Sequence, residues 1–199
     1  MKQGEVRLQL CVGCSNTRIG AQQIAKSDER ELAFEVGKRM AYLRPERFVT
    51  LALGTLPKLE SAFMGSVLAS GARVRAHDGS QFGESANDET KKLAGTLKLQ
   101  VPGPLLEQVG ELSARLSGRV GNGLISGWRT ATDLTANRVG LIVSNDLETA
   151  AKSIATEGSA LSSMSVKDRL RDLLAYSVSE QYFTVRRHLG LHVRGEVKA

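Results

Sequence analysis

The spacing of apolar residues along the chain predicts a mainly helical protein. From Ser27 onward, apolar side chains recur every three or four residues, as on one face of a helix, and Pro45 is expected to close the first helix. Asp28 and Glu31 form a D-x-x-E pattern, which is typical of a helix N-terminus. The same reasoning predicts further helices over residues 46–53, 56–70, 89–97, 104–117, 123–144, 146–157 and 166–189.

Two stretches depart from the helical pattern. Residues 5–11 alternate polar and apolar side chains as a half-buried strand does, and the turn-like sequence GCSNTRIG that follows predicts a short β hairpin. Residues 72–88 contain Gly79 and Gly83 and lack a helical repeat, so we expect a loop there. The expected fold class is therefore mainly α, with a short N-terminal β hairpin, in a single domain over residues 1–199.

The composition is that of an ordinary globular protein. Hydrophobic residues make up 41% of the chain and charged residues 24%, which argues against disorder. No apolar run reaches the ~18 residues of a membrane-spanning helix, and no signal-peptide core follows the charged N-terminus. The sequence therefore predicts a cytoplasmic chain without a membrane span. Because it starts at a strand-like segment, it could be part of a longer protein.

The charge balance brings an anionic partner into consideration. The net charge is +6 and the sequence pI is about 9.5, but basic and acidic residues alternate along most of the chain. This scatter favours solvated helix faces over a nucleic-acid surface. A nucleic-acid partner is not expected, and a basic anion-binding or nucleic-acid-binding module remains an alternative.

Cys11 and Cys14 form a single C-x-x-C, a spacing found in zinc sites, in redox pairs and among ordinary buried cysteines. A zinc site would need two further ligands. His188 and His192 lie near the opposite end of the chain, and Gly190 between them disfavours a regular helix. We interpret the cysteines as two small buried residues and leave metal binding open.

The segment DERELAFEVGKRMAYLRPE resembles the active-site helix of the HExxH zinc metallopeptidases, in particular the prenyl-endopeptidase and heat-shock membrane protease group. FEVGK stands where that group has HEVGH. A later segment, DLTANRVGL, stands where the group carries an E-x-x-x-D motif on a second helix. The resemblance covers residues 28–45 and 130–150 and the order of helices between them, and it implies a helical, zincin-like domain.

Carried over to this sequence, the resemblance implies a degenerate site. Phe34 and Lys38 stand at the two histidine ligands, and Glu35 stands at the general base. Asp133 stands at the glutamate ligand and Asn137 at the final aspartate. A catalytic zinc site needs neutral imidazoles on one helix face, and neither phenylalanine nor a protonated lysine can replace them. No metal or other cofactor is therefore expected at these positions.

The leading hypothesis is a non-catalytic protein-interaction or scaffolding domain with a protein partner, a pseudo-peptidase and not an enzyme. The alternative is a metallopeptidase with unusual ligands or another hydrolase. The glycine-containing loops GSQFG and GRVGNG match no phosphate-binding motif, and no G-x-S-x-G surrounds a serine. If the fold is zincin-like, Lys38 should be partly buried against carboxylates, with Asp133 and Glu35 as its proposed partners.

Overall fold

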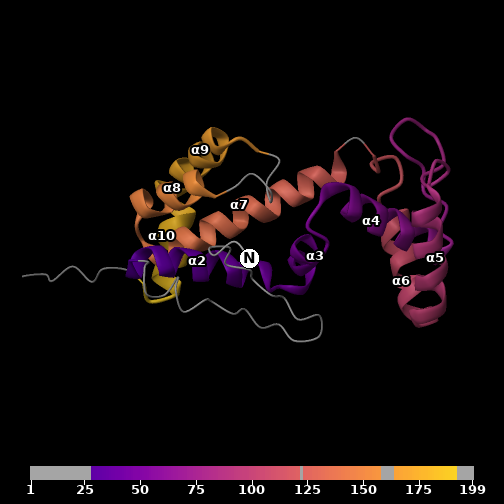
Figure 1. Cartoon of the computed structure of the whole chain (residues 1–199), viewed down its shortest axis with the longest axis horizontal. Coiled ribbons are helices and arrows are strands. Elements are labelled where there is room, and N and C mark those ends of the chain that lie inside the picture. Colours follow the sequence, from indigo (N-terminus) through magenta and orange to yellow (C-terminus); the bar gives the residue numbers. More distant parts are fainter. Residues whose placement is uncertain (1–27, 122, 158–163, 192–199) are drawn as a thin grey trace, which may run out of the picture. The chain divides into compact units, whose positions relative to one another are not determined.

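The computed structural model describes residues 28–121, 123–157 and 164–191, and this part of the chain is mainly helical, as predicted (Figure 1). Its β structure is limited to two isolated bridges. The predicted N-terminal hairpin, with Cys11 and Cys14, lies outside the described residues, as does His192. The described helices are α2 (Glu29–Tyr42), α3 (Pro45–Leu53), α4 (Leu56–Ser70), α5 (Asp88–Gln100), α6 (Gly103–Ala114), α7 (Leu124–Ser144), α8 (Leu147–Thr156), α9 (Val166–Ser177) and α10 (Glu180–His188).

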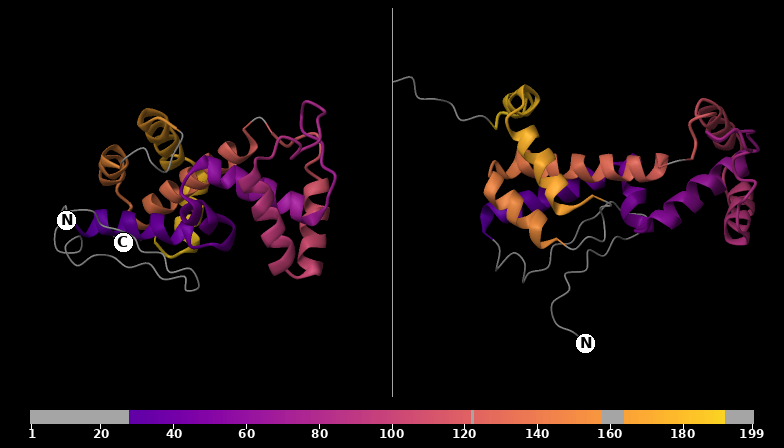
Figure 2. Two further views of the ribbon diagram at one scale, coloured as in Figure 1. Left: turned by 45° about the vertical axis from the view of Figure 1, so that its right-hand side comes forward. Right: turned by 90° about the horizontal axis from the view of Figure 1, so that it is seen from above.

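Contacts divide the chain into two compact units. Unit 1 comprises residues 1–52 and 130–199, and unit 2 comprises residues 53–129, so unit 2 is inserted into the sequence of unit 1. Within unit 1, α8 contacts both α2 and α9, and within unit 2, α4 contacts both α5 and α6. Figure 2 gives two further views of the helices. The expected single domain over residues 1–199 remains a prediction. None of the described helices is long and apolar enough to cross a bilayer.

The main core of unit 1 collects apolar side chains from five helices. Each fully buried leucine, isoleucine or phenylalanine side chain stabilises the fold by about 1.5–3 kcal/mol relative to exposure. The buried members come from α2, α7, α8, α9 and α10, and they are Phe34, Leu141, Ile142, Ala150, Ile154, Leu173, Tyr176 and Tyr182.

Two glycines let α2 and α7 pack closely. A Cβ on Gly37 would lie 2.9 Å from Cγ2 of Val143, and a Cβ on Gly140 would lie 2.8 Å from the ring of Phe34. Interaxial distance depends on the side chains at the crossing, and glycine permits the shortest one. Phe34 thus contacts the later part of α7, whereas Tyr42 contacts Asp133 in its earlier part. The two helices therefore run antiparallel, and the two motif-like segments lie side by side.

Unit 2 is built on α4 and a pair of short extended segments. Phe82 donates its N–H to the carbonyl of Val74, and Ala76 forms a parallel bridge with Val120. Val67, Val74 and Val120 form its small buried core. Apart from these bridges, residues 72–87 are turns and loop, as predicted, and Asn87 caps α5 by accepting the N–H of Thr90.

The predicted single helix over 166–189 is wrong, because the chain forms α9 and α10 with a break at Ser179. Ser179 has an extended backbone, its side chain accepts the N–H of Tyr182, and its hydroxyl donates to the carbonyl of Tyr176. A serine in this position starts a new helix. Apolar spacing continues across the break, so periodicity alone does not reveal it.

Asp146 caps α8 and provides a test of helix capping. Its carboxylate accepts the N–H of Thr149 at 3.0 Å and a hydrogen bond from the guanidinium of Arg30 at 2.7 Å. We expect Asp146→Ala to lower the free energy of unfolding at neutral pH by about 1 kcal/mol, measured by urea titration. Asp146→Asn is the control, because asparagine caps helices about as well as aspartate. A loss as large in Asp146→Asn would show that the charge, and not the cap, stabilises α8.

The same residue predicts a pH dependence. The N–H of Thr149, followed by the Arg30 guanidinium, lowers the pKa of Asp146 below its usual value. A carboxyl with a lowered folded-state pKa contributes stability above its unfolded-state pKa of about 3.9, and this contribution is lost as the pH falls through the folded-state pKa. The stability difference between the native chain and Asp146→Ala should therefore shrink below about pH 4.

Candidate functional site

A group of buried polar side chains lies in unit 1, where α2, α7 and α9 meet the end of α8. We call this group the buried polar cluster. Five of its six members are at most 2% exposed. The sixth member is Glu157, and its side chain is 16% exposed. Buried charges are costly unless they are paired, so the contacts of the cluster determine what it can do. The members are Lys38 and Tyr42 of α2, Asp133 and Asn137 of α7, Glu157 after α8, and Arg169 of α9.

The Glu157 carboxylate joins the two buried cations of the cluster. Its Oε2 lies 2.5 Å from Nζ of Lys38 and 2.9 Å from a terminal nitrogen of Arg169. Arg169 also donates to the carbonyl of Ile154 at 3.5 Å. Together with the carboxylate of Asp133, the cluster holds two cations and two anions, so its formal charge is balanced.

Asp133 is bonded to Tyr42 across the crossing of the two helices. The Tyr42 hydroxyl donates to Oδ1 of Asp133 at 2.6 Å. Burial and, after it, the negative charge of Asp133 raise the pKa of Tyr42 above its usual value. Tyr42 therefore stays neutral and acts as a hydrogen-bond donor, so it offers no general base at neutral pH.

Among the described residues, the buried side-chain atoms that have no hydrogen-bond partner in the protein all belong to the buried polar cluster. They are Oδ2 of Asp133, both polar atoms of Asn137 and Nε of Arg169. Asp133 and Asn137 are four residues apart on α7, which places them on one face of the helix. Buried polar groups of this kind usually bind ordered water, so this side of the cluster retains hydrogen-bonding capacity.

The five residues singled out by the peptidase resemblance have different environments. Lys38, Asp133 and Asn137 belong to the buried polar cluster. Phe34 is fully buried in the apolar core, with its ring against Gly140. Glu35 is partly exposed, and its carboxylate lies 3.6 Å from the Arg39 guanidinium. Burial raises the pKa of Glu35, and the charges of Arg39 and Lys38 oppose that shift.

The prediction that Lys38 is buried against a carboxylate is confirmed, and its ion-pair partner is Glu157. The sequence hypothesis had proposed Asp133 and Glu35. Neither Glu157 nor Arg169 was identified from the sequence. A lysine on the apolar face of α2 does require a nearby carboxylate, but helical spacing gives no information about which distant acid supplies it.

The residues at the motif-like positions do not fit a catalytic zinc ion. Phe34 has no lone pair, and the Lys38 side chain is already in an ion pair with Glu157. Within the described ranges, no three histidine, cysteine, aspartate or glutamate side chains come together as a metal-binding group. No reaction step through a metal is therefore derived from this site.

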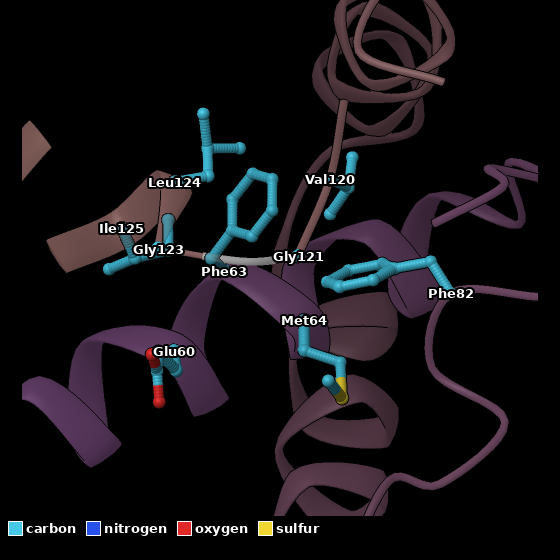
Figure 3. A pocket seen from close by; sticks show the side chains of 9 residues that line it. All are labelled: Glu60, Phe63, Met64, Phe82, Val120, Gly121, Gly123, Leu124 and Ile125. Atoms are coloured by element: carbon cyan, nitrogen blue, oxygen red, sulfur yellow. The ribbon is translucent and has the colours of Figure 1, made fainter. Parts of the chain in front are cut away.

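Unit 2 contains a separate apolar cavity of about 170 Å³ (Figure 3). Its walls include the rings of Phe63 and Phe82, whose centroids are 5.7 Å apart. Glu60 is the charged residue at this cavity, and its carboxylate points away from the Phe63 ring. The cavity suits an apolar group and brings together no acid–base pair. The other lining residues are Met64, Val120, Gly121, Gly123, Leu124 and Ile125.

Comparison with known proteins found no matching family model, no matching curated protein and no matching solved structure.

Proposed function

We propose that this chain is a non-catalytic protein-interaction or scaffolding domain with a degenerate zincin-like core. The observation that supports the proposal is the ion pair between Lys38 and Glu157. Lys38 stands where the resemblance implies a histidine ligand, and it is buried in a salt bridge with an acid that Arg169 also binds. In this proposal, a structural ion-pair cluster has replaced a metal centre.

The surroundings of the cluster also favour a non-catalytic role. Metal-assisted hydrolysis needs an open coordination position for water, next to a general base. Phe34 packs into the core at the other ligand position, and Glu35 is paired with Arg39. The polar groups that remain can hold water and stabilise the fold, but they lack an activated nucleophile.

Exposed apolar side chains on α9, on α10 and at the junction between them support a protein partner. Leu174 is 56% exposed, Val178 73% and Phe183 54%. Exposed large apolar side chains are costly in water, and a partner surface would cover them. A scaffolding role requires such a surface and no catalytic group.

Zinc content and peptidase activity test the proposal. We expect the purified chain, incubated with zinc and dialysed, to retain no stoichiometric zinc and to cleave no peptide in a zinc-dependent way. The reason is that no imidazole stands at either ligand position. Glu35→Gln serves as the matched variant and should behave as the parent does. Stoichiometric zinc that is lost on Glu35→Ala, or zinc-dependent cleavage abolished by Glu35→Gln, would disprove the proposal.

A further inference from the structure

The positive charge of unit 2 is concentrated on two short segments, residues 72–82 and 114–121. Together they carry four arginines and one acidic residue, Asp78. The remainder of unit 2 has five basic and six acidic residues. The sequence alone shows two separate basic stretches, whereas the structure brings them together. The arginines are Arg73, Arg75, Arg115 and Arg119.

Backbone hydrogen bonds hold these segments side by side. Gly118 donates its N–H to the carbonyl of Arg75 at 2.8 Å, and His77 donates its N–H to the carbonyl of Val120 at 3.0 Å. Side chains alternate between the two faces of extended backbone. Val74 and Val120 are buried on the inner face. The neighbouring residues Arg73 and Arg75 therefore lie on the outer face. Arg119 lies in the turn between Gly118, which is bonded to Arg75, and Val120. All three arginines are exposed, and we call them the arginine face.

Among the residues that the structure describes, none provides an anionic partner for the arginine face. None of its three arginines forms an ion pair in the described structure, and neither does the adjacent Arg115. Like charges held on adjacent segments repel one another, and an external anion would relieve that repulsion.

We propose that the arginine face binds an acidic, extended segment of a protein partner. This inference rests on the proposed interaction function and names the chemistry of the partner. Arg73 and Arg75 are two residues apart on extended backbone, about 6.6 Å, which is also the spacing of alternate side chains in an extended peptide. Guanidinium groups bind carboxylates through two parallel hydrogen bonds, so alternate acidic residues of the partner match this face.

Nucleic acid fits the arginine face less well. Single strands bind by stacking bases on aromatic side chains. Phe82 is the aromatic residue of these segments, and its ring packs against Phe63. A DNA duplex carries a charge every ~1.7 Å and needs a protein surface on the order of 600 Å² or more. Four arginines would neutralise only a few of its phosphates.

The test measures binding of a fluorescent peptide of alternating glutamate and serine to the full chain at about 50 mM and about 200 mM salt. The triple variant Arg73→Gln, Arg75→Gln, Arg119→Gln should weaken binding at least about tenfold at the lower salt concentration, since it removes three ion pairs.

The matched control carries Lys91→Gln, Lys92→Gln and Lys98→Gln on α5. These lysines are exposed, lie in the same unit and change the net charge equally, so affinity should change less than about twofold. Thermal unfolding of both variants checks that they fold.

Three results would overturn the inference. Both triple variants could lose affinity equally, which would show that the peptide responds to the net charge of the chain and not to this face. A glutamine–serine peptide could bind as tightly as the acidic one, or a DNA duplex could bind more tightly at the same salt concentration. Loss of peptide binding leaves the non-catalytic proposal intact, whereas zinc-dependent cleavage would disprove that proposal and leave the arginine face intact.

Discussion

Replacing Glu157 with glutamine should lower the free energy of unfolding by about 3–5 kcal/mol. The substitution keeps the shape of the side chain but removes the anion that Lys38 and Arg169 share, and both of these cations are 1% exposed. A buried cation without its counter-charge bears the full cost of desolvation. Urea unfolding of the native chain and the variant measures the difference.

Two further variants separate the buried ion pair from a general charge effect. Glu148→Gln removes the partner of Lys152 in a pair whose side chains are 80% and 73% exposed, and it should cost less than about 1 kcal/mol. Adding Lys38→Met to Glu157→Gln should recover part of the lost stability, because one buried charge is then absent. Equal losses in Glu157→Gln and Glu148→Gln would contradict a structural role for the cluster.

Gly140→Ala should destabilise the chain by about 2–3 kcal/mol, through overpacking at the crossing of α2 and α7. A Cβ at this position would lie 2.8 Å from the Phe34 ring and 2.9 Å from the backbone oxygen of Phe34. The ring can shift, but the backbone oxygen belongs to α2 and can move only with that helix. Thermal or urea unfolding gives the loss.

Gly127→Ala on the same helix provides the control. A Cβ at Gly127 meets no atom within 4 Å, so alanine should stabilise α7 there by about 0.5–1 kcal/mol through its better helix propensity. Phe34→Leu should reduce the cost of Gly140→Ala without abolishing it, because the contact with the backbone oxygen persists. If Gly127→Ala and Gly140→Ala have the same effect, close packing does not explain the glycine in α7.

Helix positions were largely predictable because local residues mark them. The predicted bounds of residues 56–70 are those of α4, which has Pro57 in its first turn and Gly71 as a left-handed C-cap with φ of 71°. The break at Ser179 was missed because its cap lies inside a continuing apolar repeat. Local signals therefore located the starts and ends of helices better than an interruption within a periodic stretch.

The candidate site was predicted only in part. The apolar face of α2 indicated that Lys38 would be buried, but the hydrogen bond to Glu157 spans 119 residues of sequence. Periodicity identifies which face of a helix is buried and carries no information on the distant residue that meets it. The arginine face was missed for the same reason, since its two segments pair only in the folded chain.

The insertion of unit 2 has a consequence for the order of events during synthesis. Tyr42 and Asp133 are 91 residues apart, so a ribosome adding about 5–20 residues per second takes on the order of 5–20 seconds to travel between them. All residues of unit 2 are synthesised in this interval. Throughout it, the apolar side of α2, including Phe34, has no α7 to cover it. The apolar face of α2 therefore stays exposed in the nascent chain until the second unit has been synthesised. A chaperone that binds exposed apolar helices would act at this stage.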